Sequence, residues 1–168
     1  MSITMYQACV PVLVRALTNL SGVLTKGAAH AAEKNIAPEV LLHTRITPDM
    51  FPLIRQVQIA TDMAKGAAFR LAGKDVPKME DNETTFEELQ KRIAYVIDLL
   101  KGFKPEEIDG SEDREVVLQT RTNELRFRGQ DYLLGFVLPN IYFHCTTAYA
   151  ILRGAGVALG KMDFIGKP

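Results

Sequence analysis

Apolar residues recur at intervals of three and four over four long stretches of the chain. The first stretch runs from about Thr4 to about Ala32, and its stripe consists of Tyr6, Val10, Leu13, Leu17, Leu20 and Leu24. The others run from the TPDMFP segment to Ala72, from TTFEE to Gly102, and from near Asp131 to Gly154 or Gly156. This spacing matches the turn of an α-helix. The pattern therefore predicts four long amphipathic helices that share one core.

At the start of each of the first three helices, two residues are candidates for the N-cap position. Serine, threonine and aspartate side chains accept hydrogen bonds from the first N–H groups of a helix. The TTFEE segment offers a capping box, with a glutamate three residues after a threonine. The competing N-caps are Ser2 or Thr4 for the first helix, Asp49 or Thr47 for the second, and Thr84 or Thr85 for the third.

The connections after the first and third helices are long, and the second of them contains two short alternating runs. EVVLQ at 115–119 and ELRFR at 124–128 flank Thr122-Asn123, which predicts a β-hairpin. Two strands alone are marginally stable, so we expect the hairpin to lie against the helices. Long connections favour a crossover topology over an up-down-up-down bundle. The predicted fold is all-α, a four-helix bundle with a small hairpin between the third and fourth helices.

The fourth predicted helix is apolar nearly all round, as expected for a helix surrounded by protein. Pro139 interrupts it, and its ring would displace the carbonyl of Gly135 and kink the helix. Asn140, His144 and Thr147 follow at spacings of four and three, so they share one face. We expect any functional site to lie on this face.

Two polar residues of the second predicted helix complete the candidate site. Gln58 and Asp62 lie one turn apart beside its buried stripe. If His144 is a buried structural histidine, Asn140 or Gln58 is its expected hydrogen-bond partner. Burial in apolar surroundings would lower the pKa of His144 and keep the imidazole neutral, as a base or a ligand requires.

Composition limits the functional classes. The chain has 168 residues, which suits a single domain over 1–168, and 20 basic residues balance 20 acidic ones. No basic stripe indicates nucleic-acid binding. No signal peptide and no uninterrupted apolar run of membrane length is evident, so we expect a cytoplasmic protein that does not bind membranes.

Several large enzyme classes lack their motifs here. The chain has no glycine-rich phosphate loop, no CxxC, no HExxH and no nucleophile elbow. Cys9 and Cys145 fit apolar helical patterns and are expected to be buried and unpaired. Cys145 follows His144 directly, so its side chain points about 100° away around the helix. His30 and His43 are expected at the surface.

Three segments carry a resemblance to a known family. TPDMFPLIRQVQIATDMAKGAAFRLAG, DNETTFEELQKRI and GQDYLLGFVLPNIYFHCTTAYAILRGAGVALGKMDF occur in the order seen in DUF1993 proteins, which are grouped with the DinB/YfiT-like superfamily. The resemblance covers nearly the whole chain. It implies a four-helix bundle of DinB-like connectivity, often a homodimer. Many superfamily members bind nickel or zinc through three histidines, and some are transferases or isomerases that use mycothiol, bacillithiol or glutathione.

This sequence departs from that metal pattern. His144 matches the second histidine of the pair on the fourth helix, but Asn140 stands at the first position, and Gln58 aligns with the histidine of the second helix. Neutral amides are poor replacements for imidazole on nickel or zinc. Asp62 is the one carboxylate that could be recruited as a further ligand. The resemblance therefore implies a degenerate metal site, with a bound metal disfavoured.

Two functional hypotheses follow. The first is a bundle that binds a small molecule between the second and fourth helices, through Gln58, Asp62, Asn140, His144 and Thr147. The alternative is a divergent metal- or thiol-dependent transferase or isomerase, with His144 as the catalytic base or the sole strong metal ligand. Both hypotheses expect a homodimer.

Overall fold

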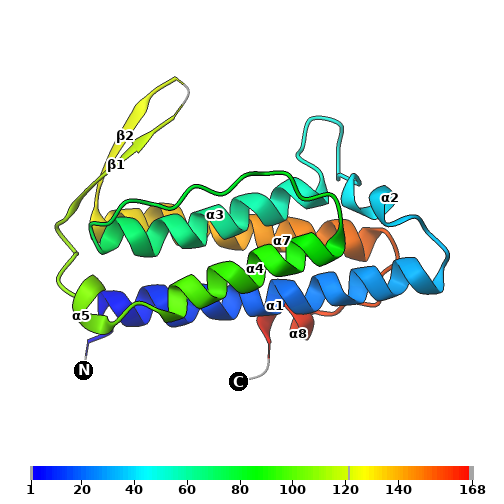
Figure 1. Cartoon of the computed structure of the whole chain (residues 1–168), viewed down its shortest axis with the longest axis horizontal. Helices are drawn as coiled ribbons and strands as arrows, with labels where there is room; N and C mark the ends of the chain where they lie inside the picture. The colour runs from blue at the N-terminus through cyan, green and yellow to red at the C-terminus, as the bar shows by residue number, and fades with distance from the viewer. Residues whose placement is uncertain (1, 121, 167–168) are drawn as a thin grey trace.

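The computed structural model describes residues 2–120 and 122–166, and four long helices dominate it (Figure 1). These are α1 (Met5–Glu33), α3 (Leu53–Leu71), α4 (Phe86–Lys101) and α7 (Leu138–Gly154). The shorter elements are α2 (Pro38–Leu42), α5 (Pro105–Ile108), β1 (Glu115–Gln119), β2 (Glu124–Arg128), α6 (Gly129–Asp131), the π-helix η1 (Tyr132–Val137) and α8 (Lys161–Ile165). The predicted mostly helical fold with a hairpin before the last long helix is confirmed.

The four long helices form a ring in which α1 and α3 each pack against both α4 and α7. Helices α3 and α4 run parallel, because Arg92 bonds Thr61 near the middle of both helices and the Phe69 and Phe103 rings, at the ends of the two helices, lie 4.9 Å apart. A parallel pair needs a connection that returns along the bundle. Residues 72–85 make it, running back over α3 (Figure 1). The crossover is therefore made after α3, not by the two connections whose length suggested it.

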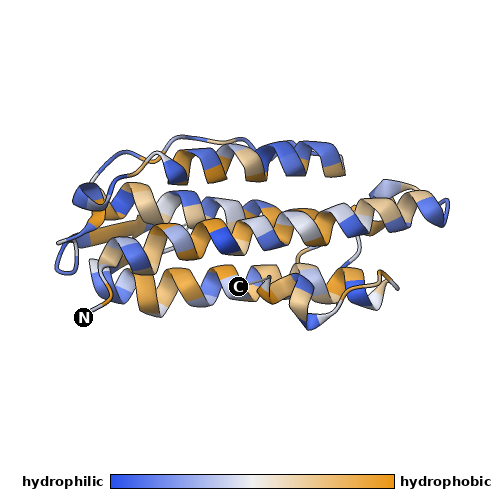
Figure 2. Cartoon of the chain, turned by 90° about the horizontal axis from the view of Figure 1, so that it is seen from below, coloured by the Kyte–Doolittle hydropathy of each residue, from blue (hydrophilic) through white to orange (hydrophobic). Residues whose placement is uncertain are grey.

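The core lies where the apolar stripes of the helices meet. Figure 2 shows hydrophobic and hydrophilic residues alternating along the helices, as amphipathic helices require. Helix α1 is long and apolar enough to cross a membrane by length and composition, but its stripe is buried in the bundle. The large side chains that are fully buried include Tyr132, Leu13, Leu17, Leu24, Leu42, Leu53, Leu71, Leu89, Ile93, Leu100, Ile108 and Leu133.

The caps decide between the alternatives left open by the sequence. Thr4 caps α1 in a capping box with Gln7, and Thr85 caps α4 in a capping box with Glu88. Neither proposed cap of the second long helix is used, because α3 begins only after Pro52. The TPDM residues form a separate turn instead, in which the Met50 N–H donates to the Thr47 carbonyl at 3.1 Å.

The hairpin has the predicted strands, paired in register from Glu115–Arg128 to Gln119–Glu124. It extends from the end of the bundle at which α7 begins (Figure 1). One face is nevertheless packed: Val116 is buried, and the Phe127 ring lies 5.9 Å from Tyr132 and 5.2 Å from Phe136. Its base therefore anchors the start of the last long helix.

The last long helix accommodates Pro139 by changing its hydrogen bonding. Helical residues are continuous from Gly129 to Gly154, so Asp131 is not a cap. In η1 the Leu138 N–H donates to the Leu133 carbonyl, five residues back. With this spacing, the N–H missing at Pro139 corresponds to the carbonyl of Leu134. The sequence predicted that Pro139 would displace the Gly135 carbonyl and kink the helix. The structure instead accommodates the proline with a π-helical turn.

Candidate functional site

His144 lies on the side of α7 that packs against α3, and its partner is Gln56. The Nδ1 atom of His144 is 2.7 Å from the Oε1 atom of Gln56. Both side chains are buried, with exposed fractions of 8 % and 1 %. The sequence had suggested Asn140 or Gln58 as the partner, and both suggestions were wrong. Gln56 lies two positions before Gln58 and therefore on a different side of α3. The side that bears Gln56 is the one in contact with α7.

The hydrogen bonds of Gln56 determine which nitrogen of His144 carries the proton. The Nε2 amide of Gln56 donates to the carbonyl of Phe51 at 2.9 Å, which fixes the orientation of the amide. Its Oε1 atom then faces His144, and a carbonyl oxygen can only accept. Nδ1 of His144 must therefore be the donor. In a neutral imidazole this leaves Nε2 with its lone pair available.

The Nε2 atom of His144 reaches the protein surface. Among the described residues, the only fully buried side-chain polar atom without a partner is Ser111 Oγ. No hydrogen bond from a described residue reaches His144 Nε2. The atom therefore has solvent access, although most of the ring is covered. Burial lowers the pKa of His144, and the positive charge of Arg55 lowers it further, so the ring is neutral at neutral pH.

One exposed phenyl ring borders this imidazole, and a second belongs to the residue whose carbonyl binds Gln56. Phe143 packs edge-on against His144 with ring centroids 5.2 Å apart, and Phe51 supplies the carbonyl bound by Gln56. Phe143 is 55 % exposed and Phe51 is 56 % exposed. Arg55 lies over the Phe51 ring at 5.9 Å. We call the five linked residues Phe51, Arg55, Gln56, Phe143 and His144 the His144 surface.

The other predicted residues of α7 make local bonds. The Asn140 side-chain amide donates to the Phe136 carbonyl at 2.7 Å, and the Thr147 hydroxyl donates to the Phe143 carbonyl at 2.8 Å. The Oδ1 atom of Asn140 accepts from no described residue. Asn140 therefore presents a second acceptor one turn from His144, while Thr147 is satisfied by its own helix.

Gln58 and Asp62 belong to a separate polar cluster on the other side of α3. Gln58 donates to Glu83 at 2.8 Å and accepts from Arg55 at 3.2 Å. Asp62 pairs with Arg92 at 3.0 Å and with Lys65 at 3.2 Å. The structure therefore does not join these two residues to Asn140, His144 and Thr147 in one pocket.

Arg92 organises this cluster, which the sequence did not reveal as a unit. Its side chain is 1 % exposed and binds Thr61 at 2.7 Å, the Glu80 carbonyl and Glu83 at 2.9 Å, and Asp62 and Asp81 at 3.0 Å. A guanidinium has five N–H donors, and these five acceptors match them. Arg92 thus fastens the returning connection 72–85 onto α3 and α4.

The described residues do not fit a nickel or zinc ion. No three histidine, cysteine, aspartate or glutamate side chains among them come close enough to bind a metal together. The amides of Asn140 and Gln58 are engaged in hydrogen bonds, and the carboxylate of Asp62 is neutralised by two cations. His144 Nε2 is a single imidazole ligand, which is too few for such a site.

The two cysteines are unsuited to nucleophilic chemistry. Cys145 faces away from His144 towards α1, as their adjacent positions predicted. Burial raises the pKa of both the Cys9 and the Cys145 thiol to about 12, so both remain protonated at neutral pH. Of the other histidines, His43 is exposed and His30 is partly buried.

Sequence reasoning missed Gln56, Phe51 and Phe143. A signal for Gln56 was present, because Leu53, Gln56, Ala60 and Ala64 are spaced as one helix face with a single polar member. No comparable signal marked the two phenylalanines, and the expectation that protein surrounds the fourth helix was wrong at Phe143, which is 55 % exposed.

Comparisons with known proteins agree with this architecture. The profile of the domain of unknown function DUF1993 matches residues 5–165. No curated protein matches the chain. A crystal structure of a DinB family member protein from Shewanella denitrificans shares 38 % sequence identity, with a TM-score of 0.87, over 97 % of this chain and 92 % of that one. The chain therefore belongs to the DUF1993 family and has the fold of a DinB protein.

Proposed function

We propose that this protein binds a small molecule at the His144 surface, without a metal ion. The observation that carries the proposal is the 2.7 Å bond between His144 Nδ1 and Gln56 Oε1, which orients the unprotonated Nε2 outward. A buried ring fixed in one tautomer is prepared in advance to accept a hydrogen bond, so little ordering is needed on binding.

The chemistry of the surface defines the ligand class. His144 Nε2 and Asn140 Oδ1 are acceptors, so the ligand should carry N–H or O–H donors. Phe51 and Phe143 offer exposed rings, so the ligand should also carry an apolar or aromatic part. An amine, amide or alcohol attached to a ring meets both requirements.

A catalytic role is the second candidate, and the same Nε2 lone pair supports it. A neutral histidine can remove a proton from a bound hydroxyl or thiol. In a divergent transferase or isomerase, a small thiol would occupy the His144 surface and lose its proton to Nε2. Neither cysteine of this chain would take part, because both thiols are buried and protonated.

A fragment screen tests the binding proposal. Ring-bearing amines, amides and alcohols are screened against the protein by NMR, and each hit is titrated against His144→Ala and the exposed-site control His43→Ala. We expect hits to weaken at least about tenfold, or about 1.4 kcal/mol, in His144→Ala and to be unchanged in His43→Ala. Hits that bind both variants equally would refute the site.

We also propose a cytoplasmic homodimer. The absence of net charge does not oppose self-association, and the family resemblance implies a dimer. Light scattering at working concentration tests this part independently of any ligand, because a monomeric mass would refute it.

A further inference from the structure

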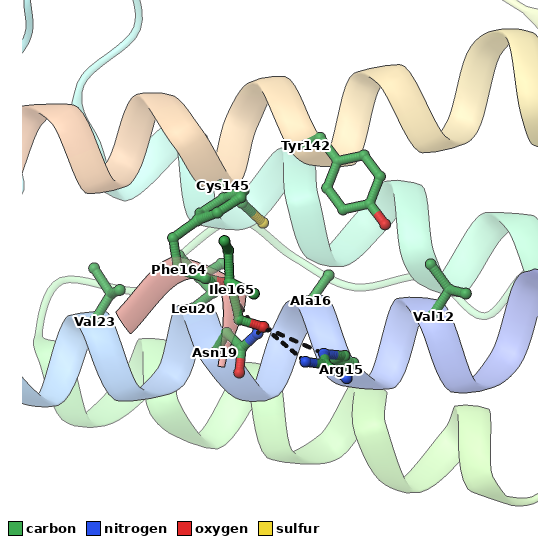
Figure 3. Close-up of a pocket in the computed structure, with 10 residues that line it drawn as sticks. All are labelled: Val12, Arg15, Ala16, Asn19, Leu20, Val23, Tyr142, Cys145, Phe164 and Ile165. Carbon is green, nitrogen blue, oxygen red and sulfur yellow. Dashed lines mark hydrogen bonds between the residues drawn. The ribbon is translucent and has the colours of Figure 1, made fainter. Parts of the chain in front are cut away.

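We propose a second binding site, for a small uncharged apolar molecule, in the cavity between α1, α7 and α8. The cavity has a volume of about 330 Å³, within the range of small-molecule sites. Its walls are mainly apolar and include Val12, Ala16 and Leu20 of α1 and Phe164 and Ile165 of α8 (Figure 3). This site is distinct from the His144 surface, because it lies on the side of α7 that bears Cys145.

The charged group at the cavity is engaged by the protein itself. Arg15 donates through Nε and Nη2 to the Ile165 carbonyl, at 3.2 Å in both cases. The Asn19 side-chain amide donates to the carbonyls of Phe164 and Ile165, each at 2.9 Å. These donors hold the end of α8, as the dashed lines in Figure 3 indicate. A charged ligand would have to displace the α8 carbonyls from Arg15 or Asn19, and these bonds hold α8 at the cavity. The cavity therefore favours an uncharged ligand.

The remaining polar groups of the cavity wall are a thiol, which is a weak hydrogen-bonding group, and a hydroxyl, which can donate or accept a hydrogen bond. The Cys145 thiol points into the cavity, and the Tyr142 ring lies beside it (Figure 3). The hydroxyl of Tyr142 bonds to no described residue, so it can donate to or accept from a single polar group of a ligand. Because the Cys145 thiol stays protonated, it contributes a soft apolar contact rather than a covalent bond.

Helix α8 provides a removable wall for this site. None of its residues is buried, and it is held by the Arg15 and Asn19 bonds, by the Lys26–Asp163 ion pair at 2.7 Å and by the edge-on contact of the Phe164 and Tyr149 rings, whose centroids lie 6.4 Å apart. The Lys26 and Asp163 side chains are 49 % and 28 % exposed, so this pair adds little stability. Segments held by few buried contacts open most easily, which gives a ligand a route into the cavity.

The test uses pyrene, an uncharged aromatic dye without N–H or O–H donors, whose emission spectrum changes in apolar surroundings. Ala16→Phe fills the cavity, and Ala94→Phe places the same ring on an exposed position of α4 as a control. We expect saturable binding to the wild-type protein, roughly tenfold weaker binding to Ala16→Phe, and unchanged binding to Ala94→Phe. Binding to His144→Ala should also be unchanged, which separates this site from the proposed His144 site.

A second variant keeps the test decisive if Ala16→Phe does not fold. Ile165 is 43 % exposed, so Ile165→Asp should fold, yet it places a charge at the cavity wall and should also weaken dye binding roughly tenfold. Absence of dye binding to the wild-type protein, or equal binding to the wild-type protein and the cavity variants, would overturn the proposal. A dimer that Ala16→Phe converts to monomers would identify a second copy of the chain as the occupant and overturn it as well.

Discussion

His144 of α7 and Gln56 of α3 are joined side chain to side chain across the interior of the bundle, with Nδ1 and Oε1 2.7 Å apart. Gln56 is in turn fixed by its bond to the Phe51 carbonyl. The chain Phe51–Gln56–His144 thus links the turn before α3 to the last long helix. It fixes the tautomer of His144 and leaves Nε2 facing outward.

Replacing Gln56 with leucine should destabilise the protein. The substitution keeps a similar volume but leaves the Nδ1–H of His144 without an acceptor, which typically costs about 1–3 kcal/mol. Urea unfolding measures the free-energy difference. Gln130→Leu, at an exposed position, should change the unfolding free energy by less than about 0.5 kcal/mol. Equal stability of the Gln56→Leu and wild-type proteins would contradict the role of this bond.

The lowered pKa of His144 predicts a pH dependence of stability. The unfolded chain binds a proton at His144 near its ordinary pKa, about 6.5, whereas the folded chain binds it only at lower pH. Between these two values the unfolded state holds more protons, so the free energy of unfolding increases with pH. The contribution of His144 is complete above about pH 6.5 and is lost as the pH falls towards the folded-state pKa.

His144→Gln, which cannot titrate, isolates this contribution. The stability of the wild-type protein relative to the variant should decrease between about pH 7.5 and about pH 5.5. Unfolding curves for both proteins at each pH provide the measurement, and His43→Gln serves as the control for an exposed histidine. A wild-type advantage that grows towards low pH would mean that the folded protein favours the imidazolium.

Arg92→Met should be the most destabilising of these substitutions. It removes a buried guanidinium with five partners and leaves Glu83, whose side chain is 10 % exposed, without its cation. Loss of one partner of a buried pair costs about 3–5 kcal/mol, and we expect the lower end because Asp62 and Asp81 are about one-third exposed. Lys91→Met, at an exposed neighbouring position, should leave the urea unfolding curve nearly unchanged. Similar costs for the two variants would contradict the anchoring role of Arg92.

The geometry also predicts how a metal site can be built. Asn140→His restores a histidine pair one turn apart on α7, and Gln56→His adds a third imidazole beside His144. Zinc should raise the melting temperature of this double variant, because a ligand bound to the folded state stabilises it. The matched Asn140→His/Gln58→His variant should respond much less, since Gln58 faces Glu83. The opposite order would support the alignment that placed Gln58 in the metal site.

Most helices and strands could be predicted from the sequence because the patterns that specify them are local. The stripe of α1, the Thr85–Glu88 capping box and the alternating strands 115–119 and 124–128 each depend on residues within a few positions. The start of α3 was misjudged because the TPDM residues can form a turn as well as a cap. Local sequence does not decide between a turn and a cap.

The site was less predictable because it depends on the rotation of α3. Gln56 and Gln58 are two residues apart, so a helix turns them about 200° away from each other. Only the packing of α3 against α7 decides which glutamine meets His144, and the crossover connection decides that Gln58 meets Glu83. The residue pattern suggested Asn140 or Gln58 as the hydrogen-bond partner of His144, and the structure pairs it with Gln56 instead.

The most direct test of the proposed site is the ¹⁵N NMR spectrum of the His144 imidazole, recorded without and with the tightest-binding fragment. We expect a neutral ring protonated at Nδ1, with an Nε2 signal typical of a bare lone pair that shifts when the fragment binds. A ring protonated at Nε2, or an Nε2 signal unaffected at saturating fragment, would contradict the claim that this nitrogen is the acceptor of the site.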